Sequence, residues 1–116
     1  MDGRDLTVDE SRLREWVGAS ASRYELWATL AARTDARSVA EIGVYRGEFA
    51  ARLLGACAGI SAYYMVDPWR RLEDWNKPAN KPDHVFEGIF REAMDKTRPY
   101  DHKRIVLNGR TSEVIE

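Results

Sequence analysis

The segment 39–48, VAEIGVYRGE, constrains the fold of this chain more than any other segment. It begins as a short apolar strand, continues into a turn between Gly43 and Gly47, and opens a helix at Glu48. A glycine in such a turn adopts a positive φ without strain and lets a ligand approach the main chain. Glu41 lies near the end of the strand, where burying an unpaired carboxylate is costly. The segment predicts a nucleotide-type ligand over a strand end, against a helix N-terminus.

The rest of the chain alternates strand and helix patterns. Two helices come first, each with the spacing of a capping box, at Thr7–Glu10 and Ser22–Glu25, and Gly18 is expected to stop the first. Beyond them we expect strands at 38–42, 62–67 and 104–108, and helices at 48–57 and from a capping Asp83 to just before Pro99. A final helix would begin after a cap at Thr111 or Ser112. Such alternation favours parallel strands with right-handed crossovers.

Several residues suited to ligand binding follow these strands directly. Glu41 and Gly43 lie at the end of the first strand, Asp67 ends the second, and Gly109 follows the third. Pro68 holds Asp67 in an extended conformation, because a residue before proline avoids the helical region. Ligands of parallel sheets bind outside the carboxyl ends of the strands. This convergence is stronger support for a binding site than any one motif.

Composition excludes several classes of function. The net charge is −1, with 18 basic and 19 acidic side chains, which gives no basic field for nucleic acid and no steering toward an anionic membrane. The apolar runs are too short to span a bilayer, and the N-terminal MDGRD lacks the layout of a secretory signal. A single cysteine, Cys57, forms no internal disulfide, so we expect a cytoplasmic protein. No spacing of His, Cys and acidic residues indicates a metal site.

The segments EIGVYRGE, VDPW and LNGRTS together resemble the class I S-adenosylmethionine-dependent methyltransferases, and more narrowly the small-molecule branch that includes macrocin-type O-methyltransferases. The match covers residues 36–116, a partial cofactor-binding domain, with residues 1–35 as an N-terminal helical cap. The resemblance implies a Rossmann-like parallel sheet of about three strands in the order 3-2-1. It also implies S-adenosyl-L-methionine as cofactor and methyl transfer to the oxygen or nitrogen of a small-molecule acceptor.

The resemblance also implies roles for individual residues. Glu41 resembles the carboxylate near the methionine end of the cofactor. Asp67 resembles the ribose-binding acid, whose two oxygens accept hydrogen bonds from both hydroxyls. Trp69 would flank the nucleoside, and Tyr45 stands where the family has a small residue in the turn. The other residues implied to contact the cofactor belong to the turns after the strands, with 110–112 at the adenine edge: Gly43, Val44, Gly47, Pro68, Gly109, Arg110, Thr111 and Ser112.

The chain departs from the family in its extent. The family's sheet has about seven strands in the order 3-2-1-4-5-7-6, and this sequence supplies three. The acidic motif of the fourth strand, often a metal ligand or proton acceptor, is absent, so no catalytic base is named and we expect little or no turnover by this chain alone. The first strand would be a sheet edge, and exposed edges invite pairing. A second copy or a partner chain would then cover it.

Alternatives remain open at the level of single residues. Glu41 would be solvent-facing if its strand frays, and Asp67 would be a plain turn residue before proline. Gly43 and Gly47 would be packing glycines if no ligand binds. Tryptophans 69 and 75 belong either to a substrate loop or to packing against the missing half of the sheet.

Two alternatives concern function as a whole. The chain would be a non-catalytic interaction module that self-associates through its open sheet edge. It would otherwise be half of a dinucleotide-binding fold, which is disfavoured because the turn lacks G-x-G-x-x-G.

Overall fold

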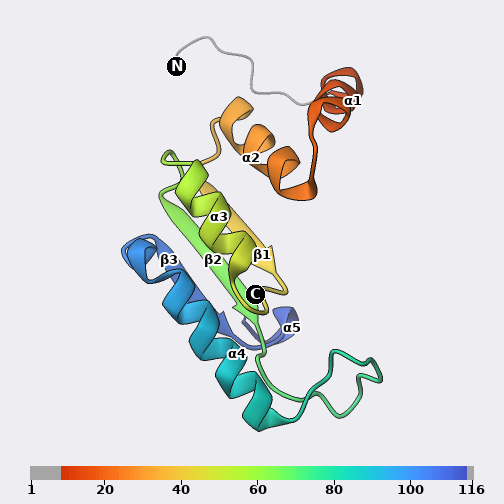
Figure 1. The fold of residues 1–116 in the computed structure, drawn as a ribbon, viewed down its shortest axis with the longest axis vertical. Coiled ribbons are helices and arrows are strands. Elements are labelled where there is room, and N and C mark those ends of the chain that lie inside the picture. Colours follow the sequence, from red (N-terminus) through yellow and green to blue (C-terminus); the bar gives the residue numbers. More distant parts are fainter. Residues whose placement is uncertain (1–8, 115–116) are drawn as a thin grey trace.

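The computed structural model describes residues 9–114. Its elements are two leading helices followed by alternating strands and helices (Figure 1), namely α1 (Glu10–Ala19), α2 (Arg23–Arg33), β1 (Ser38–Ile42), α3 (Glu48–Ala56), β2 (Ala62–Asp67), α4 (Asp83–Lys96), the 3-10 turn η1 (Arg98–Tyr100), β3 (Arg104–Asn108) and α5 (Thr111–Val114). The three expected strands and the two crossover helices are confirmed to within one or two residues. None of the helices in this part of the chain combines the length and the apolar character that a membrane span needs.

The strands form one parallel sheet in the order β1-β2-β3, which is the expected order 3-2-1 viewed from the other edge. Ile42 of β1 lies opposite Val66 of β2, and Asp67 lies opposite Asn108 of β3. All three carboxyl ends therefore meet at one edge of the sheet, and the turns that follow them are neighbours in space. The α/β class and the parallel sheet are as the sequence predicts.

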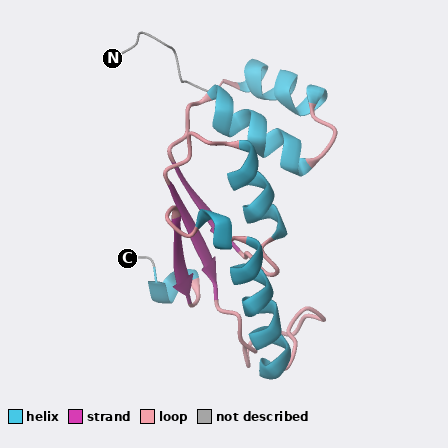
Figure 2. Ribbon diagram, turned by 60° about the vertical axis from the view of Figure 1, so that its left-hand side comes forward, coloured by secondary structure: helices cyan, strands magenta, loops and turns pink. Residues whose placement is uncertain are grey.

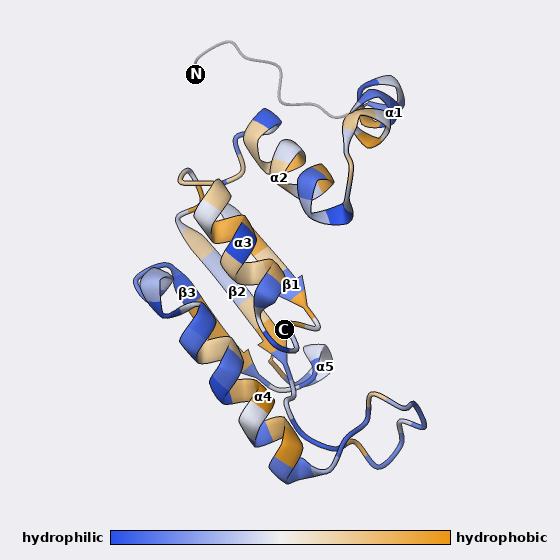
Figure 3. Ribbon diagram, viewed as in Figure 1, coloured by the Kyte–Doolittle hydropathy of each residue, from blue (hydrophilic) through white to orange (hydrophobic). Residues whose placement is uncertain are grey.

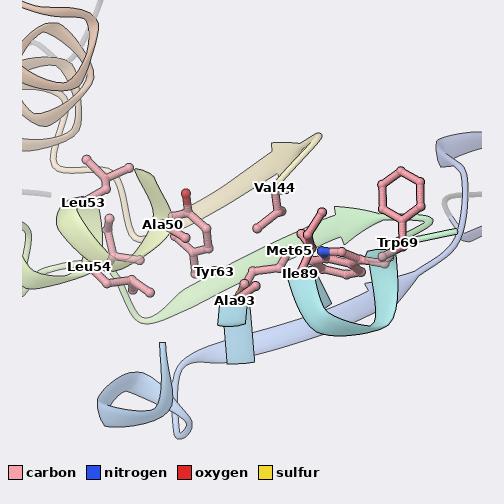
Figure 4. Packing of buried hydrophobic residues seen from close by; sticks show 11 residues of the cluster. Val44, Ala50, Leu53, Leu54, Tyr63, Met65, Trp69, Ile89 and Ala93 are labelled. Atoms are coloured by element: carbon pink, nitrogen blue, oxygen red, sulfur yellow. The ribbon is translucent and has the colours of Figure 1, made fainter. Parts of the chain in front are cut away.

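Helices α3 and α4 both cover the same face of the sheet (Figure 2). Tyr63 and Met65 project from β2 into a core against Leu53 of α3 and Ile89 and Ala93 of α4 (Figure 4). Apolar and hydrophilic residues alternate along α4, as an amphipathic helix requires (Figure 3). Phe86, Ile89 and Ala93 are buried, so the apolar side of α4 is the one that faces the core.

The opposite face of the sheet is only partly covered. Ile42, Tyr64 and Ile105 point to this face and remain 63%, 37% and 38% exposed. Adjacent positions point to opposite faces of a strand, so these three residues lie on the side away from α3 and α4.

The N-terminus of α1 differs from the prediction. Thr7 lies outside the described residues, and Asp9 is the N-cap, accepting a hydrogen bond from the Arg12 amide at 2.8 Å. The helix passes through Gly18 and ends at Ala19, so Gly18 does not stop it. Glycine is only mildly unfavourable inside a helix, which explains why it is tolerated in the last turn.

The second capping box is confirmed. Ser22 Oγ accepts a hydrogen bond from the Glu25 amide at 3.1 Å, and Glu25 Oε2 accepts one from the Ala21 amide at 2.9 Å. Helix α2 then packs on α3 through Tyr24, whose ring meets Phe49 edge-on at 6.4 Å between ring centres. Helix α2 is thus joined to α3 by an aromatic contact.

Candidate functional site

A cavity of about 630 Å³ lies at the carboxyl edge of the sheet. Residues that follow all three strands line it, together with part of the loop between β2 and α4. Seven of the residues implicated by the sequence line this cavity: Gly43, Tyr45, Asp67, Pro68, Gly109, Arg110 and Thr111. The structure therefore brings together the turns that the sequence singles out.

Five implicated residues lie elsewhere. Glu41 lines a smaller neighbouring cavity of about 230 Å³, which shares Ile42 and Gly43 with the larger one. The other four do not line the large cavity: Val44 is buried in the core, Gly47 packs against α4, Trp69 is buried, and Ser112 is exposed in α5. A position in a motif-bearing turn does not by itself turn a residue toward the cavity.

The two glycines of the turn serve different purposes. Gly43 has φ +87° and no atom within 4 Å of where a Cβ would stand, so within the folded chain the positive φ, and not packing, requires glycine there. Gly47 has φ +80°, and a Cβ there would lie 2.8 Å from Ala93 Cα. Gly47 is therefore a packing glycine, which lets α4 approach the start of α3. Only Gly43 of the pair faces the cavity.

Asp67 is 9% exposed and ends β2 at the cavity. Its Oδ2 accepts a hydrogen bond from the Tyr45 amide at 2.8 Å, and its Oδ1 accepts one from the Trp69 amide at 2.8 Å. The carboxylate thus joins the β1–α3 turn to the loop after β2, which is more than a plain turn residue does. An ionised carboxylate has roughly four acceptor sites, so about two remain for a ligand.

The position of Trp69 matches neither role that the sequence suggested, a substrate loop or packing against the missing half of the sheet. It is 5% exposed and meets the ring of Phe90 edge-on at 5.0 Å, so it belongs to the core between the sheet edge and α4. Its indole Nε1 donates a hydrogen bond to the Tyr45 carbonyl oxygen at 2.8 Å. A buried tryptophan needs such an acceptor for its N–H. Trp69 is not positioned to flank a ligand in the large cavity.

Glu41 is half-buried and is not the solvent-facing residue of a frayed strand. Its Oε1 accepts a hydrogen bond from the Tyr63 hydroxyl at 2.8 Å. Burial raises the pKa of Glu41, the Tyr63 bond and the Arg23 charge oppose that rise, and the Asp67 charge adds to it. Burial and the Glu41 charge also raise the pKa of Tyr63. Glu41 and Asp67 therefore lie close enough to act on each other electrostatically at the same rim.

The loop between β2 and α4 supplies cavity residues that sequence reasoning missed. Leu72, Asp74 and Ala79 line the cavity, and so does Trp75, which the sequence left undecided. The buried Asn80 side chain orders this loop. Its Oδ1 accepts from the Leu72 amide at 3.0 Å, and its Nδ2 donates to the carbonyl oxygens of Leu72 and Trp75, each at 2.7 Å. The only sequence signal for an ordered loop was an asparagine between two prolines. The groups that Asn80 binds are determined by the folded loop and could not be predicted.

The end of this loop corrects the expected start of α4. Pro82 is the N-cap residue, and the Asp83 carboxylate accepts a hydrogen bond from the Arg71 amide at 2.8 Å. Asp83 thus fixes the loop and does not cap the helix.

Ion pairs connect the loop to the turn after β3 and to α5. Arg110 pairs with Asp74, and Arg70 Nη2 lies 2.9 Å from Glu113 Oε1. The Arg110 guanidinium lowers the pKa of Asp74.

The start of α5 also corrects the sequence. Thr111 is the first helical residue and Ser112 the second, so neither is the cap. Glu113 Oε1 instead accepts a hydrogen bond from the Arg110 amide at 2.7 Å.

No protein-family model matches this chain, and no curated protein or solved structure matches it. Within the described residues, no three His, Cys, Asp or Glu side chains gather closely enough to hold a metal ion. The site is therefore interpreted from its own geometry.

Proposed function

We propose that this chain binds S-adenosylmethionine at the carboxyl edge of its sheet, as the cofactor-binding part of a methyltransferase with a Rossmann-like fold. The observation that carries the proposal is the placement of Gly43, Asp67 and Gly109, which lie at the carboxyl ends of three adjacent strands and line one cavity. Ligand sites in parallel sheets form at this edge. A volume of about 630 Å³ falls within the range of small-molecule sites.

The charges of the rim suit the cofactor's positive groups. S-adenosylmethionine carries a sulfonium and an ammonium, and the rim presents the carboxyl groups of Glu41 and Asp67 in neighbouring cavities that share Gly43. The free acceptor sites of Asp67 would take the ribose hydroxyls in the large cavity, and Glu41 would face the amino-acid end in the small one. Glycine at position 43 lines both cavities and adds no side chain to either.

When bound, the cofactor supplies an electrophilic methyl group for an acceptor oxygen or nitrogen. The residues of this chain would hold and orient the nucleoside and keep water away from it, which are the main tasks in such a transfer. We assign no general base to the cavity, so the proposal concerns cofactor binding and not turnover by this chain alone.

Calorimetric titration with S-adenosylmethionine, S-adenosylhomocysteine, adenosine and NAD tests the proposal. We expect the first two to bind, adenosine to bind more weakly and NAD not to bind. Asp67→Ala should weaken binding of S-adenosylhomocysteine by at least about 1–3 kcal/mol, because the ribose hydroxyls lose their acceptor and the Tyr45 and Trp69 amides lose theirs. Glu87→Ala is the control, since it removes an exposed carboxylate of α4 that lines neither cavity. Absence of binding by both sulfur compounds would contradict the proposal.

A second candidate function is self-association through the sheet. One observation in its favour is the set of exposed apolar side chains on the face away from α3 and α4, namely Ile42, Tyr64 and Ile105. The other is that, among the described strands, β1 and β3 are edge strands with a hydrogen-bonded neighbour on one side only. Light scattering over a concentration series tests it. A mass that stays at 13.3 kDa would exclude self-association in that range.

A further inference from the structure

Two aromatic residues at the carboxyl edge have backbone conformations that L-residues rarely adopt. Tyr45 has φ +57° and Trp69 has φ +43°. Positive φ is unfavourable for bulky side chains and persists only where the surroundings enforce it. Such conformations concentrate at ligand sites, and Tyr45 lines the large cavity.

The contacts that enforce these conformations form a closed set of three hydrogen bonds. Asp67 accepts from the amides of both Tyr45 and Trp69, at 2.8 Å each. The Trp69 indole then donates to the Tyr45 carbonyl oxygen, also at 2.8 Å. Both the N–H and the C=O of Tyr45 are therefore held by side chains at the end of β2 and just beyond it.

Packing makes this arrangement rigid from the other side. The Trp69 ring is buried against Phe90 of α4, so the indole N–H has little freedom to move away from its acceptor. Arg46, the next residue of the turn, stacks over the Tyr45 ring at 5.1 Å and pairs with Glu92 of α4 at 2.7 Å. The turn is thus fixed to α4 twice, once through Trp69 and once through Arg46.

We propose that Trp69 is a positioning residue for the ligand site, acting through its indole N–H on the left-handed Tyr45 peptide. This inference rests on the proposed function for the identity of the ligand, but not for the hydrogen bonds. Trp69 does not line the cavity itself, but it holds Tyr45, which does. Removing the indole N–H releases Tyr45 toward ordinary backbone conformations and moves the cavity wall that Tyr45 forms.

The first test compares Trp69→Phe with Phe90→Leu. Trp69→Phe removes the N–H and keeps an aromatic ring, whereas Phe90→Leu loosens the same packing and keeps the N–H. We expect Trp69→Phe to weaken S-adenosylhomocysteine binding about fivefold to tenfold, the factor that one hydrogen bond represents. Phe90→Leu loosens the packing of the indole but leaves its N–H able to reach the acceptor, so it should weaken affinity less than Trp69→Phe does. Equal effects of the two variants on affinity would overturn the proposal.

A double-mutant cycle with Tyr45→Gly isolates the mechanism. Glycine adopts positive φ without strain, so the turn of this variant should no longer need the indole. The effect of Trp69→Phe on affinity should fall below about twofold in the Tyr45→Gly background. An undiminished effect would mean that the indole does not act by holding residue 45 in a strained left-handed conformation, contrary to the proposal.

Amide hydrogen exchange separates this inference from the proposed function, because it needs no ligand. We expect Trp69→Phe to speed exchange of the Tyr45 amide at least about tenfold relative to Phe90→Leu. If the unmodified chain bound no S-adenosylhomocysteine and this acceleration were seen, the proposed function would fail and the positioning role of Trp69 would stand. An unchanged exchange rate at Tyr45 would overturn the positioning role itself.

Discussion

Alanine substitution of the two turn glycines should have different consequences, although both have positive φ. Gly47→Ala combines two costs. An alanine held in the left-handed region costs about 1–2 kcal/mol, and forcing a methyl group to within 2.8 Å of Ala93 Cα adds about 1–3 kcal/mol of overpacking. The sum, about 2–5 kcal/mol, is a large part of the roughly 5–15 kcal/mol that stabilises a small domain.

Gly43→Ala is the matched control, because only the first cost applies where a Cβ meets no atom. We expect about 1–2 kcal/mol of destabilisation there. The change in the unfolded chain is the same for both variants, so it cancels in their difference. Urea unfolding followed by circular dichroism measures both free energies, and the difference between them should be about 1–3 kcal/mol. Ligand affinity should show the reverse order, since Gly43 lines the cavity and Gly47 does not.

The result that refutes this reasoning is a Gly47→Ala variant no less stable than Gly43→Ala. It would mean that α4, at Ala93, does not lie as close to Gly47 at the start of α3 as the structure shows. The separation of the two glycines into a packing and a cavity residue would then be wrong.

Three further outcomes are expected. Asn80→Ala should speed proteolysis within the 70–82 loop, because the buried side-chain amide of Asn80 binds the backbone N–H and C=O of Leu72. Asn80→Asp still accepts the hydrogen bond but no longer donates one, so it should give an intermediate rate. Arg104→Met should destabilise the fold by about 1.5–3 kcal/mol in thermal unfolding, since the guanidinium donates a hydrogen bond to the Met94 carbonyl oxygen at 2.7 Å. A variant as stable as the unmodified chain would exclude a stabilising role for this bond. Burial raises the pKa of Glu41, so the folded chain retains this proton above the unfolded pKa, and stability should fall as pH rises from the unfolded to the folded value. Glu41→Gln should flatten that decline, whereas Glu87→Gln on the exposed side of α4 should not.

The sheet could be predicted from the sequence because its signals are local. Short apolar-rich strand segments, glycines in the turns and the prolines at 68 and 99 each affect only the few residues around them. Parallel pairing then follows from the alternation of strand and helix, and it places Gly43, Asp67 and Gly109 at one edge.

The roles of single side chains could not be predicted in the same way. Trp69 is buried because Phe90 on α4 offers its ring as a partner, and Gly47 is a packing residue because Ala93 approaches it. Both partners lie far along the chain. The carboxylate of Asp83 likewise binds the Arg71 amide only because the intervening loop folds back on itself.

The central claim is tested most directly by the backbone amide resonances of isotopically labelled chain during titration with S-adenosylhomocysteine. The account predicts saturable shifts at Gly43, Asp67 and Gly109, with little change at Gly18 and Gly59, which lie outside the cavity. Shifts confined to residues away from the carboxyl edge, or no shifts at ligand concentrations well above those of the protein, would contradict it.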